Sequence, residues 1–167
     1  MINYYDWAEY QSKMHSNKVA ITDYSLNKKI SYKELNLSSC KIANFLQNMG
    51  IGHSDRVAIL SKNHSIFFEL QFACSKIGSI MVPLNWRLTA NELAFILNDC
   101  EPSLLIVDDC FKVTADQLRS FIPNMNIQFF NSDEKPSEFQ ENIENSTIDF
   151  KQVSLTLDDL IMIMYTS

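Results

Sequence analysis

Short apolar runs without polar interruption recur along the chain and alternate with segments of helical periodicity. Residues 57–60 are four consecutive apolar residues, and similar runs follow at residues 80–84 and 104–107. A run that lacks polar alternation is typical of a strand buried on both faces, as in a parallel sheet. Regular alternation of such strands with helices implies crossover connections and helices on both faces of the sheet. The predicted fold class is therefore α/β, with an open, mostly parallel sheet flanked by helices.

Capping residues mark the boundaries of the predicted helices. Two pairs have the spacing of a capping box, namely Ser31 with Glu34 and Thr89 with Glu92. Asn63 can cap the helix that lies between them, and Gly50 and Gly78 stand where left-handed C-terminal caps belong. We therefore expect helices at residues 31–50 and 63–78 and a third helix that begins at Thr89.

Outside these segments the pattern is weaker. Further expected elements are a hairpin at residues 19–22 and 28–31, a helix at 113–121, a strand at 127–130 and a last strand at 160–165. Residues 131–152 are polar and include Pro136, so a solvated loop or a short helix is expected there. The last strand should return to the sheet.

Length and charge exclude several classes of protein. With 167 residues, of which 46% are hydrophobic, the chain has the size of one domain with a sizeable core. The net charge of −6 comes without a block of basic residues, so no nucleic-acid partner is expected. No apolar stretch approaches the ~20 residues that span a bilayer, and the N-terminus does not read as a secretory signal. We expect a cytoplasmic protein without a transmembrane segment.

The cysteines and histidines show no metal-binding pattern. No Cys-x-x-Cys spacing occurs among the four cysteines, which are Cys40, Cys74, Cys100 and Cys110. Each lies in or beside an apolar segment, as reduced cysteines of a cytosolic protein do. The three histidines are scattered and have no Cys or His partner at ligand spacing. We predict neither a metal site nor a disulfide.

Polar residues after the predicted strands are candidates for a ligand site. In open α/β sheets, ligands bind beyond the carboxyl ends of the strands. This rule selects four places, Ser61-Lys62-Asn63, Asn85-Trp86-Arg87, Asp108-Asp109 and Thr166-Ser167. Each also has a structural interpretation: Asn63 as a helix cap, Arg87 as a surface cation, the aspartates as loop residues and Thr166 as a strand terminus. The residues alone leave both interpretations open.

Glycine-rich phosphate motifs are missing from the 167 residues. The only glycines are Gly50, Gly52 and Gly78, so neither a Gly-x-Gly-x-x-Gly fingerprint nor a Walker loop can be formed. No local signature of a Ser-His-Asp or Cys-His arrangement is present either. We therefore assign no catalytic residue and expect that the chain as it stands cannot enclose a polyphosphate.

Several segments together resemble the adenylate-forming, or AMP-binding, enzymes. They are residues 29–35, residues 55–59 with Asn63, and residues 78–89 with Glu92-Leu93. This superfamily contains acyl-CoA synthetases, luciferases and the adenylation domains of peptide synthetases. The run Pro83-Leu84-Asn85-Trp86-Arg87-Leu88-Thr89 is the most specific part and is similar to the acyl-CoA synthetase branch. The resemblance runs from about Trp7 to Ser167 and is weaker at residues 111–151.

The resemblance implies that residues 1–167 are the N-terminal part of an AMP-binding domain. Tyr165-Thr166-Ser167 is similar to the start of the family's phosphate loop, whose glycines and lysine would follow. The implied reaction joins a carboxylic acid to coenzyme A through an acyl-adenylate, with Mg-ATP as the co-substrate that is converted to AMP and pyrophosphate. Thr166 and Ser167 would contact ATP phosphates, and Arg87 would lie near the coenzyme A channel. No tightly bound cofactor is expected in the chain alone.

Other interpretations remain open beside this one. The chain alone should be inactive, because the rest of the phosphate loop and the later domain are missing from it. It could instead be a free-standing, non-catalytic domain that binds a partner or associates with itself through an unfinished edge. It could also belong to a peptide synthetase adenylation domain. Asp55 and Arg56 are interpreted as a structural pair at the amino-terminal edge of the sheet, away from the ligand side.

Overall fold

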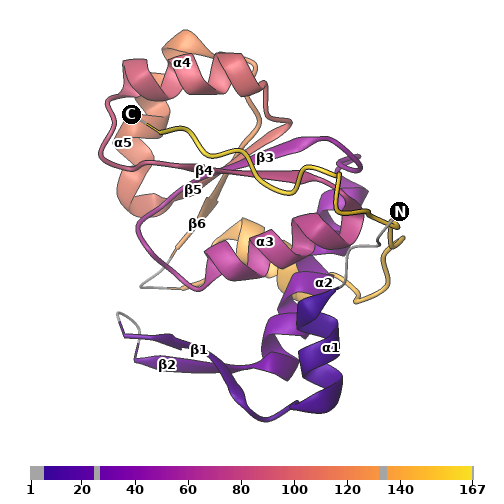
Figure 1. Ribbon diagram of the computed structural model, residues 1–167. Helices are drawn as coiled ribbons and strands as arrows, with labels where there is room; N and C mark the ends of the chain where they lie inside the picture. The colour runs from indigo at the N-terminus through magenta and orange to yellow at the C-terminus, as the bar shows by residue number, and fades with distance from the viewer. Residues whose placement is uncertain (1–5, 25–26, 132–134, 167) are drawn as a thin grey trace.

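A computed structural model of the chain describes residues 6–24, 27–131 and 135–166. The elements are α1 (Trp7–Met14), β1 (Val19–Asp23), β2 (Lys28–Ser31), α2 (Tyr32–Asn48), β3 (Arg56–Leu60), α3 (Ile66–Ile77), β4 (Ile80–Leu84), α4 (Ala90–Cys100), β5 (Leu104–Asp108), η1 (Asp109–Phe111), α5 (Lys112–Phe121), β6 (Ile127–Phe130) and α6 (Glu138–Asn145). Figure 1 shows their arrangement. From β3 to β6, strands and helices alternate, as the apolar runs predict.

The main sheet has four parallel strands in the order β4-β3-β5-β6. Ile59 of β3 lies opposite Pro83 of β4 on one side and Ile106 of β5 on the other. β3 and β5 are therefore central, which explains why their residues 57–60 and 104–107 are all buried. The predicted α/β class with an open, parallel sheet is confirmed.

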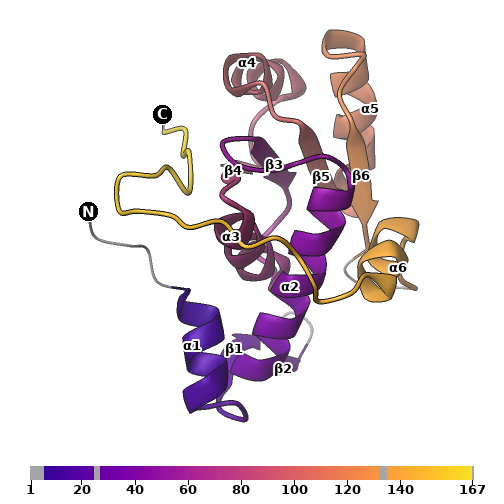
Figure 2. The ribbon, with the colours of Figure 1, turned by 90° about the vertical axis from the view of Figure 1, so that its right-hand side faces the viewer.

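Alternate residues of the strands face two different layers of helices. Val57 and Ile59 pack with α2, α3 and α6, whereas Ala58 and Leu60 pack with α4 and α5. Figures 1 and 2 show α4 and α5 on one side of the sheet and α2 and α3 on the other. The two-residue period of a strand thus divides a continuous apolar run between two cores.

The N-terminal elements lie outside the main sheet. β1 and β2 form the predicted hairpin as a separate antiparallel pair. Helix α1 was not anticipated; it begins after Asp6, whose side chain accepts a hydrogen bond from Glu9 N–H (3.0 Å). Asp6 also forms an ion pair with Lys76 of α3 (2.6 Å), and this lysine donates to Asn36 of α2 (2.8 Å). A contact with a residue 70 positions further along the sequence therefore holds the start of α1.

Most of the predicted helix caps are present. Both capping boxes form, and Gly50 and Gly78 have positive φ angles of 81° and 75°. The prediction for Asn63 is wrong, because α3 begins only at Ile66 and its N-cap is Ser65. The chain makes a further turn after β3, and His64 Nδ1, instead of Asn63, accepts from Ile66 N–H (3.1 Å).

Two predictions for the C-terminal third need correction. Residues 131–152 contain helix α6, so the short-helix alternative holds, and Phe139 and Ile143 bury their side chains against α2 and the sheet. Residues 160–165 do not form a regular strand; they run beside β4 and make one parallel bridge, between Met81 and Met162. Two main-chain hydrogen bonds around Met81 are too few for a continuous ladder.

Asp55 and Arg56 are structural residues, but they do not pair with each other. Asp55 accepts a hydrogen bond from Gly52 N–H (2.8 Å). The Arg56 guanidinium donates to the carbonyl oxygens of Cys100 and Glu101, each at 2.6 Å, where α4 ends. A cation is favourable there because the last carbonyls of a helix have no partner within it. Within the described ranges, no helix is both long and apolar enough to cross a bilayer.

Candidate functional site

The loops after β3 and β4 bring two cations to one aromatic ring at the carboxyl edge of the sheet. Arg87 Cζ lies 4.4 Å from the centroid of the Trp86 ring, and Lys62 Nζ lies 5.5 Å from it. Phe111, which follows β5, places its ring 6.1 Å from that of Trp86. We call Lys62, Trp86, Arg87 and Phe111 the Trp86 cluster. Each cation lies within the range of a cation–π interaction.

Asn85 sets the turn that presents Trp86 and Arg87. Its side-chain oxygen accepts from Arg87 N–H (3.1 Å), and its carbonyl accepts from Leu88 N–H (3.1 Å). An asparagine that bonds the backbone two residues ahead is typical of a tight turn. The Arg87 side chain is exposed, so its guanidinium keeps donors free to face solvent or a ligand.

Asp108 and Asp109 have different environments, although the sequence places them together. Asp108 is buried; its carboxylate lies 3.3 Å from the Ser61 hydroxyl and accepts from Cys110 N–H (3.2 Å). It therefore joins the end of β5 to the end of β3 and has a structural role. Asp109 is exposed at the start of η1.

The segment that ends at Thr166 is held by side chains at two places. Tyr165 Oη donates to Asp99 of α4 (2.5 Å), and this carboxylate raises the pKa of the Tyr165 hydroxyl above its ordinary value. Asp159 accepts from Thr156 N–H (2.7 Å) and lies 3.3 Å from His53 Nε2. Thr166 is exposed, and Ser167 lies outside the described residues. Within those residues, no hydrogen bond or ion pair joins Thr166 to the Trp86 cluster.

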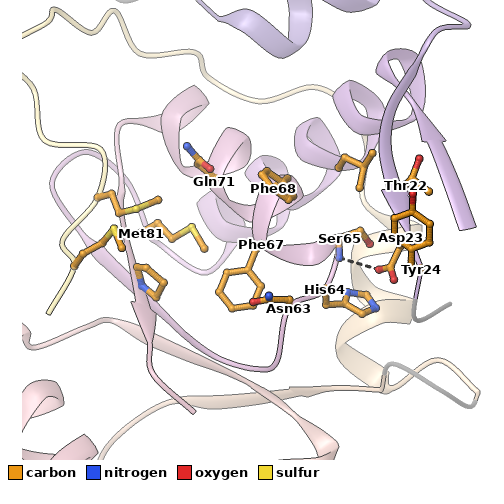
Figure 3. A pocket seen from close by; sticks show the side chains of 14 residues that line it. Thr22, Asp23, Tyr24, Asn63, His64, Ser65, Phe67, Phe68, Gln71 and Met81 are labelled. Atoms are coloured by element: carbon orange, nitrogen blue, oxygen red, sulfur yellow. Dashed lines mark hydrogen bonds between the residues drawn. The ribbon is translucent and has the colours of Figure 1, made fainter. Parts of the chain in front are cut away.

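An apolar cavity of about 660 Å³ lies between the hairpin, the start of α3, β4 and the segment beside β4. Its apolar wall includes Phe67, Phe68, Met81, Met162 and Met164. Figure 3 shows Phe67 between Met81 and the hairpin residues. Pockets of this size and lining are typical of sites for small molecules. Sequence reasoning missed this cavity, and the alternating methionines of residues 160–165 were the available signal.

A hydrogen bond between Ser65 and Asp23 lies at the hairpin side of the cavity. Asp23 of β1 is buried and accepts from Ser65 N–H (3.3 Å), as the dashed line in Figure 3 marks. The contact ties the hairpin to the start of α3, whose N-cap residue, Ser65, makes no capping bond with its own side chain.

The described residues offer neither a cluster of metal ligands nor, at Cys74, a reactive thiol. Across residues 6–24, 27–131 and 135–166, no three His, Cys, Asp or Glu side chains gather as metal ligands would. All four cysteines are free. Burial raises the pKa of the Cys74 thiol to about 12, which leaves it protonated and unreactive at neutral pH.

Comparison with known proteins places the chain in a family. Residues 8–167 match the family described as AMP-binding enzyme, so the chain belongs to that family. It is similar over 155 residues, at 30% identity, to the long-chain-fatty-acid–CoA ligase FadD13 of Mycobacterium tuberculosis; the match covers 89% of this chain and 29% of that protein. It is also similar over 94 residues, at 37% identity, to the fatty acid–[acyl-carrier-protein] ligase ScoC of Streptomyces coeruleorubidus, covering 56% of this chain and 18% of that protein.

Solved structures agree with this assignment. The inhibitor-bound N-terminal domain of FACL13 from Mycobacterium tuberculosis superposes with a TM-score of 0.87 at 27% identity, covering 100% of this chain and 42% of that one. The predicted family and the N-terminal position of the match are confirmed. The chain spans 29% of FadD13 and 18% of ScoC, well under the full length of either relative.

Proposed function

We propose that residues 1–167 form the N-terminal part of the AMP-binding domain of an ATP-dependent carboxylate–CoA ligase. The main support is the family match, together with the position of Tyr165-Thr166-Ser167 after a segment that runs beside β4. Both relatives named above are fatty acid ligases, and the acceptor is CoA in one and an acyl carrier protein in the other. CoA is the acceptor in this proposal, and the carboxylate is not specified further.

The reaction proceeds in two steps. A carboxylate oxygen attacks the α-phosphorus of Mg-ATP, which gives an acyl-adenylate and releases pyrophosphate. The thiol of CoA then attacks the acyl carbon, and AMP leaves. Catalysis of this kind depends on donors and cations that stabilise the charge on the phosphate oxygens. Thr166 and Ser167 contribute the first hydroxyls and amides of the phosphate loop.

Arg87 is assigned to the phosphates of CoA. Its guanidinium is exposed and stacks on Trp86, with the Lys62 ammonium at the same ring. A guanidinium held in place by a ring can bind a phosphate through two parallel hydrogen bonds. The second cation increases the local positive potential, although the net charge of the 167 residues is −6.

The isolated 167-residue chain is expected to be inactive. Its only glycines are Gly50, Gly52 and Gly78, which lie outside the loops at the carboxyl edge of the sheet. A backbone that wraps a triphosphate needs glycines in such a loop. The relatives that carry the activity are several times longer than the matched segment.

The test is carboxylate-dependent ATP–pyrophosphate exchange. The native gene is read through codon 167 and onward, and the protein it encodes is assayed with short, long and aromatic carboxylates, with and without CoA. Exchange that requires a carboxylate, followed by CoA-dependent AMP release, supports the proposal. A complete protein without any carboxylate-dependent exchange contradicts it. Exchange by the 167-residue chain alone contradicts only the expected inactivity.

A non-catalytic binding domain is the second candidate. Met164, which lines the cavity, is 67% exposed, and Leu160 in the same segment is 65% exposed, so apolar surface is available for self-association. Light scattering of the 167-residue chain tests this, and a monomer at all concentrations contradicts it. A cytoplasmic location belongs to the main proposal and is supported by the four free thiols.

A further inference from the structure

Residues 156–165 form the last part of the connection between α6 and Thr166, and residues 161–163 are held beside β4 without forming a regular strand. The main-chain bonds that join this segment to β4 lie around Met81, whose N–H donates to Ile161 O (3.1 Å) and whose carbonyl accepts from Ile163 N–H (3.0 Å). One bridge of this kind leaves the register of the segment weakly determined, since a strand is normally aligned by a ladder of such bonds. Side chains must therefore determine where the segment ends.

Alternate residues of this segment face the two cores. Met162 packs against the core that includes α2 and α3, whereas Ile163 and Tyr165 pack against the core that includes α4 and α5. A shift by one residue would exchange these sides and move the Tyr165 hydroxyl away from α4. In the observed register, Tyr165 Oη donates a hydrogen bond to Asp99 Oδ2 (2.5 Å).

We propose that Tyr165, through Asp99, is a positioning residue that fixes the point at which the phosphate-binding segment leaves the sheet. The role rests on the proposed function, because it concerns the placement of Thr166 and the residues after it toward ATP. Tyr165 directly precedes Thr166, so its side chain is the last anchor before the phosphate contacts begin. A hydrogen bond with a charged acceptor is stronger than one between neutral groups, which suits an anchor near the surface.

Hydrogen exchange of the 167-residue chain tests the anchor without ATP. Tyr165→Phe removes only the hydroxyl, and the exchange of Ile163 N–H should then accelerate about 3- to 10-fold, the range expected for one hydrogen bond. Amides of β3 and β5 should keep their protection. Tyr24→Phe is the matched control, because Tyr24 is 91% exposed, and it should change nothing. Unchanged exchange of Ile163 in the Tyr165→Phe variant overturns the proposal.

Variants of Asp99 separate an anchor from a general packing effect. Asp99→Ala should accelerate Ile163 exchange as much as Tyr165→Phe does, and the double variant should add nothing further, because both remove the same bond. Asp99→Asn keeps an oxygen acceptor and should restore part of the protection. Fully additive effects of the two single variants overturn the assignment.

The complete protein tests the role in positioning. Tyr165→Phe should raise KM for ATP about 3- to 10-fold, by loss of the same hydrogen bond, while KM for the carboxylate stays within error. An active complete enzyme whose KM for ATP is unchanged by Tyr165→Phe overturns the positioning role alone. A wild-type complete protein without exchange activity overturns the proposed function and this role with it.

Discussion

Lys76 and Asp6 form an ion pair, and replacing Asp6 should lower the free energy of unfolding more than replacing Lys76 does. The Lys76 side chain is 2% exposed, and its ammonium contacts Asp6 at 2.6 Å and Asn36 at 2.8 Å. Asp6→Ala leaves this ammonium buried without its counter-charge, which costs about 3 kcal/mol or more. It also removes the cap that binds Glu9 N–H, which costs about 1 kcal/mol. The expected loss of unfolding free energy is about 4 kcal/mol, or roughly 8–16 °C in Tm for a chain of this length.

Replacing the lysine should cost far less. Lys76→Met keeps most of the buried stem and leaves Asp6, at 13% side-chain exposure, with its cap bond and partial hydration. The expected loss is about 1 kcal/mol, from the donor that Asn36 loses. In the double variant Asp6→Ala, Lys76→Met, the buried charge is absent, so it should be more stable than Asp6→Ala alone by about 2 kcal/mol.

Urea unfolding followed by circular dichroism measures these differences. Asp6→Asn is a useful comparison, because asparagine still caps α1 but carries no charge. The reasoning is refuted if Lys76→Met destabilises the protein as much as Asp6→Ala does, or if the double variant is less stable than both single variants. Either result would mean that the pair stabilises through packing instead of compensating a buried charge.

Two further predictions concern the amino-terminal edge of the sheet. Gly78→Ala should cost about 1–2 kcal/mol, because Gly78 has a φ of 75° and an added Cβ would lie 2.7 Å from the His53 ring. Gly52→Ala, where nothing lies within 4 Å, is the control and should change the unfolding free energy by less than about 0.5 kcal/mol in the same urea experiment. Hydrogen bonds from Thr156 and the contact with His53 hold the pKa of Asp159 below its ordinary value. Ionised Asp159 should therefore stabilise the folded protein at pH values above 3.8, the pKa of an unperturbed aspartate, and this stabilisation should be lost as pH falls through the lower pKa of the folded state. NMR titration of the Asp159 side chain measures this pKa, and a midpoint above 3.8 contradicts the prediction.

Local sequence signals were sufficient for the central elements. β3 and β5 lie between two strands and two layers of helices, so burial selected apolar residues at every position and left an uninterrupted run. Capping boxes act over three residues, and for that reason those at Ser31 and Thr89 could be recognised before any tertiary contact was known. The rule that ligand loops follow parallel strands selected the loops that carry Lys62, Trp86 and Arg87, and the structure brings these three side chains together; ligand binding there stays a prediction.

The family resemblance supplied what physical reasoning from single residues could not. Polar residues after a strand are compatible with a turn, a cap or a ligand contact, and Asn85, Asp108 and Arg87 illustrate this range. Asn85 and Asp108 hold loops together, whereas Arg87 remains exposed over Trp86. Only the order and spacing of several segments indicate an AMP-binding enzyme from the sequence.

By itself, the sequence determined the α/β class, the parallel strands and most helix ends, because these depend on burial periodicity and on contacts within one helical turn. The tertiary structure alone decided the features that depend on long-range contacts. These are the Lys76–Asp6 pair that holds α1, the displaced start of α3, and the single bridge that replaces a last strand. It also decided the Trp86 cluster and the Tyr165–Asp99 bond, since each joins side chains that are separated by more than one element. No local sequence pattern predicts such a contact, because its stabilising energy depends on a residue in a distant segment and not on the residue's own segment.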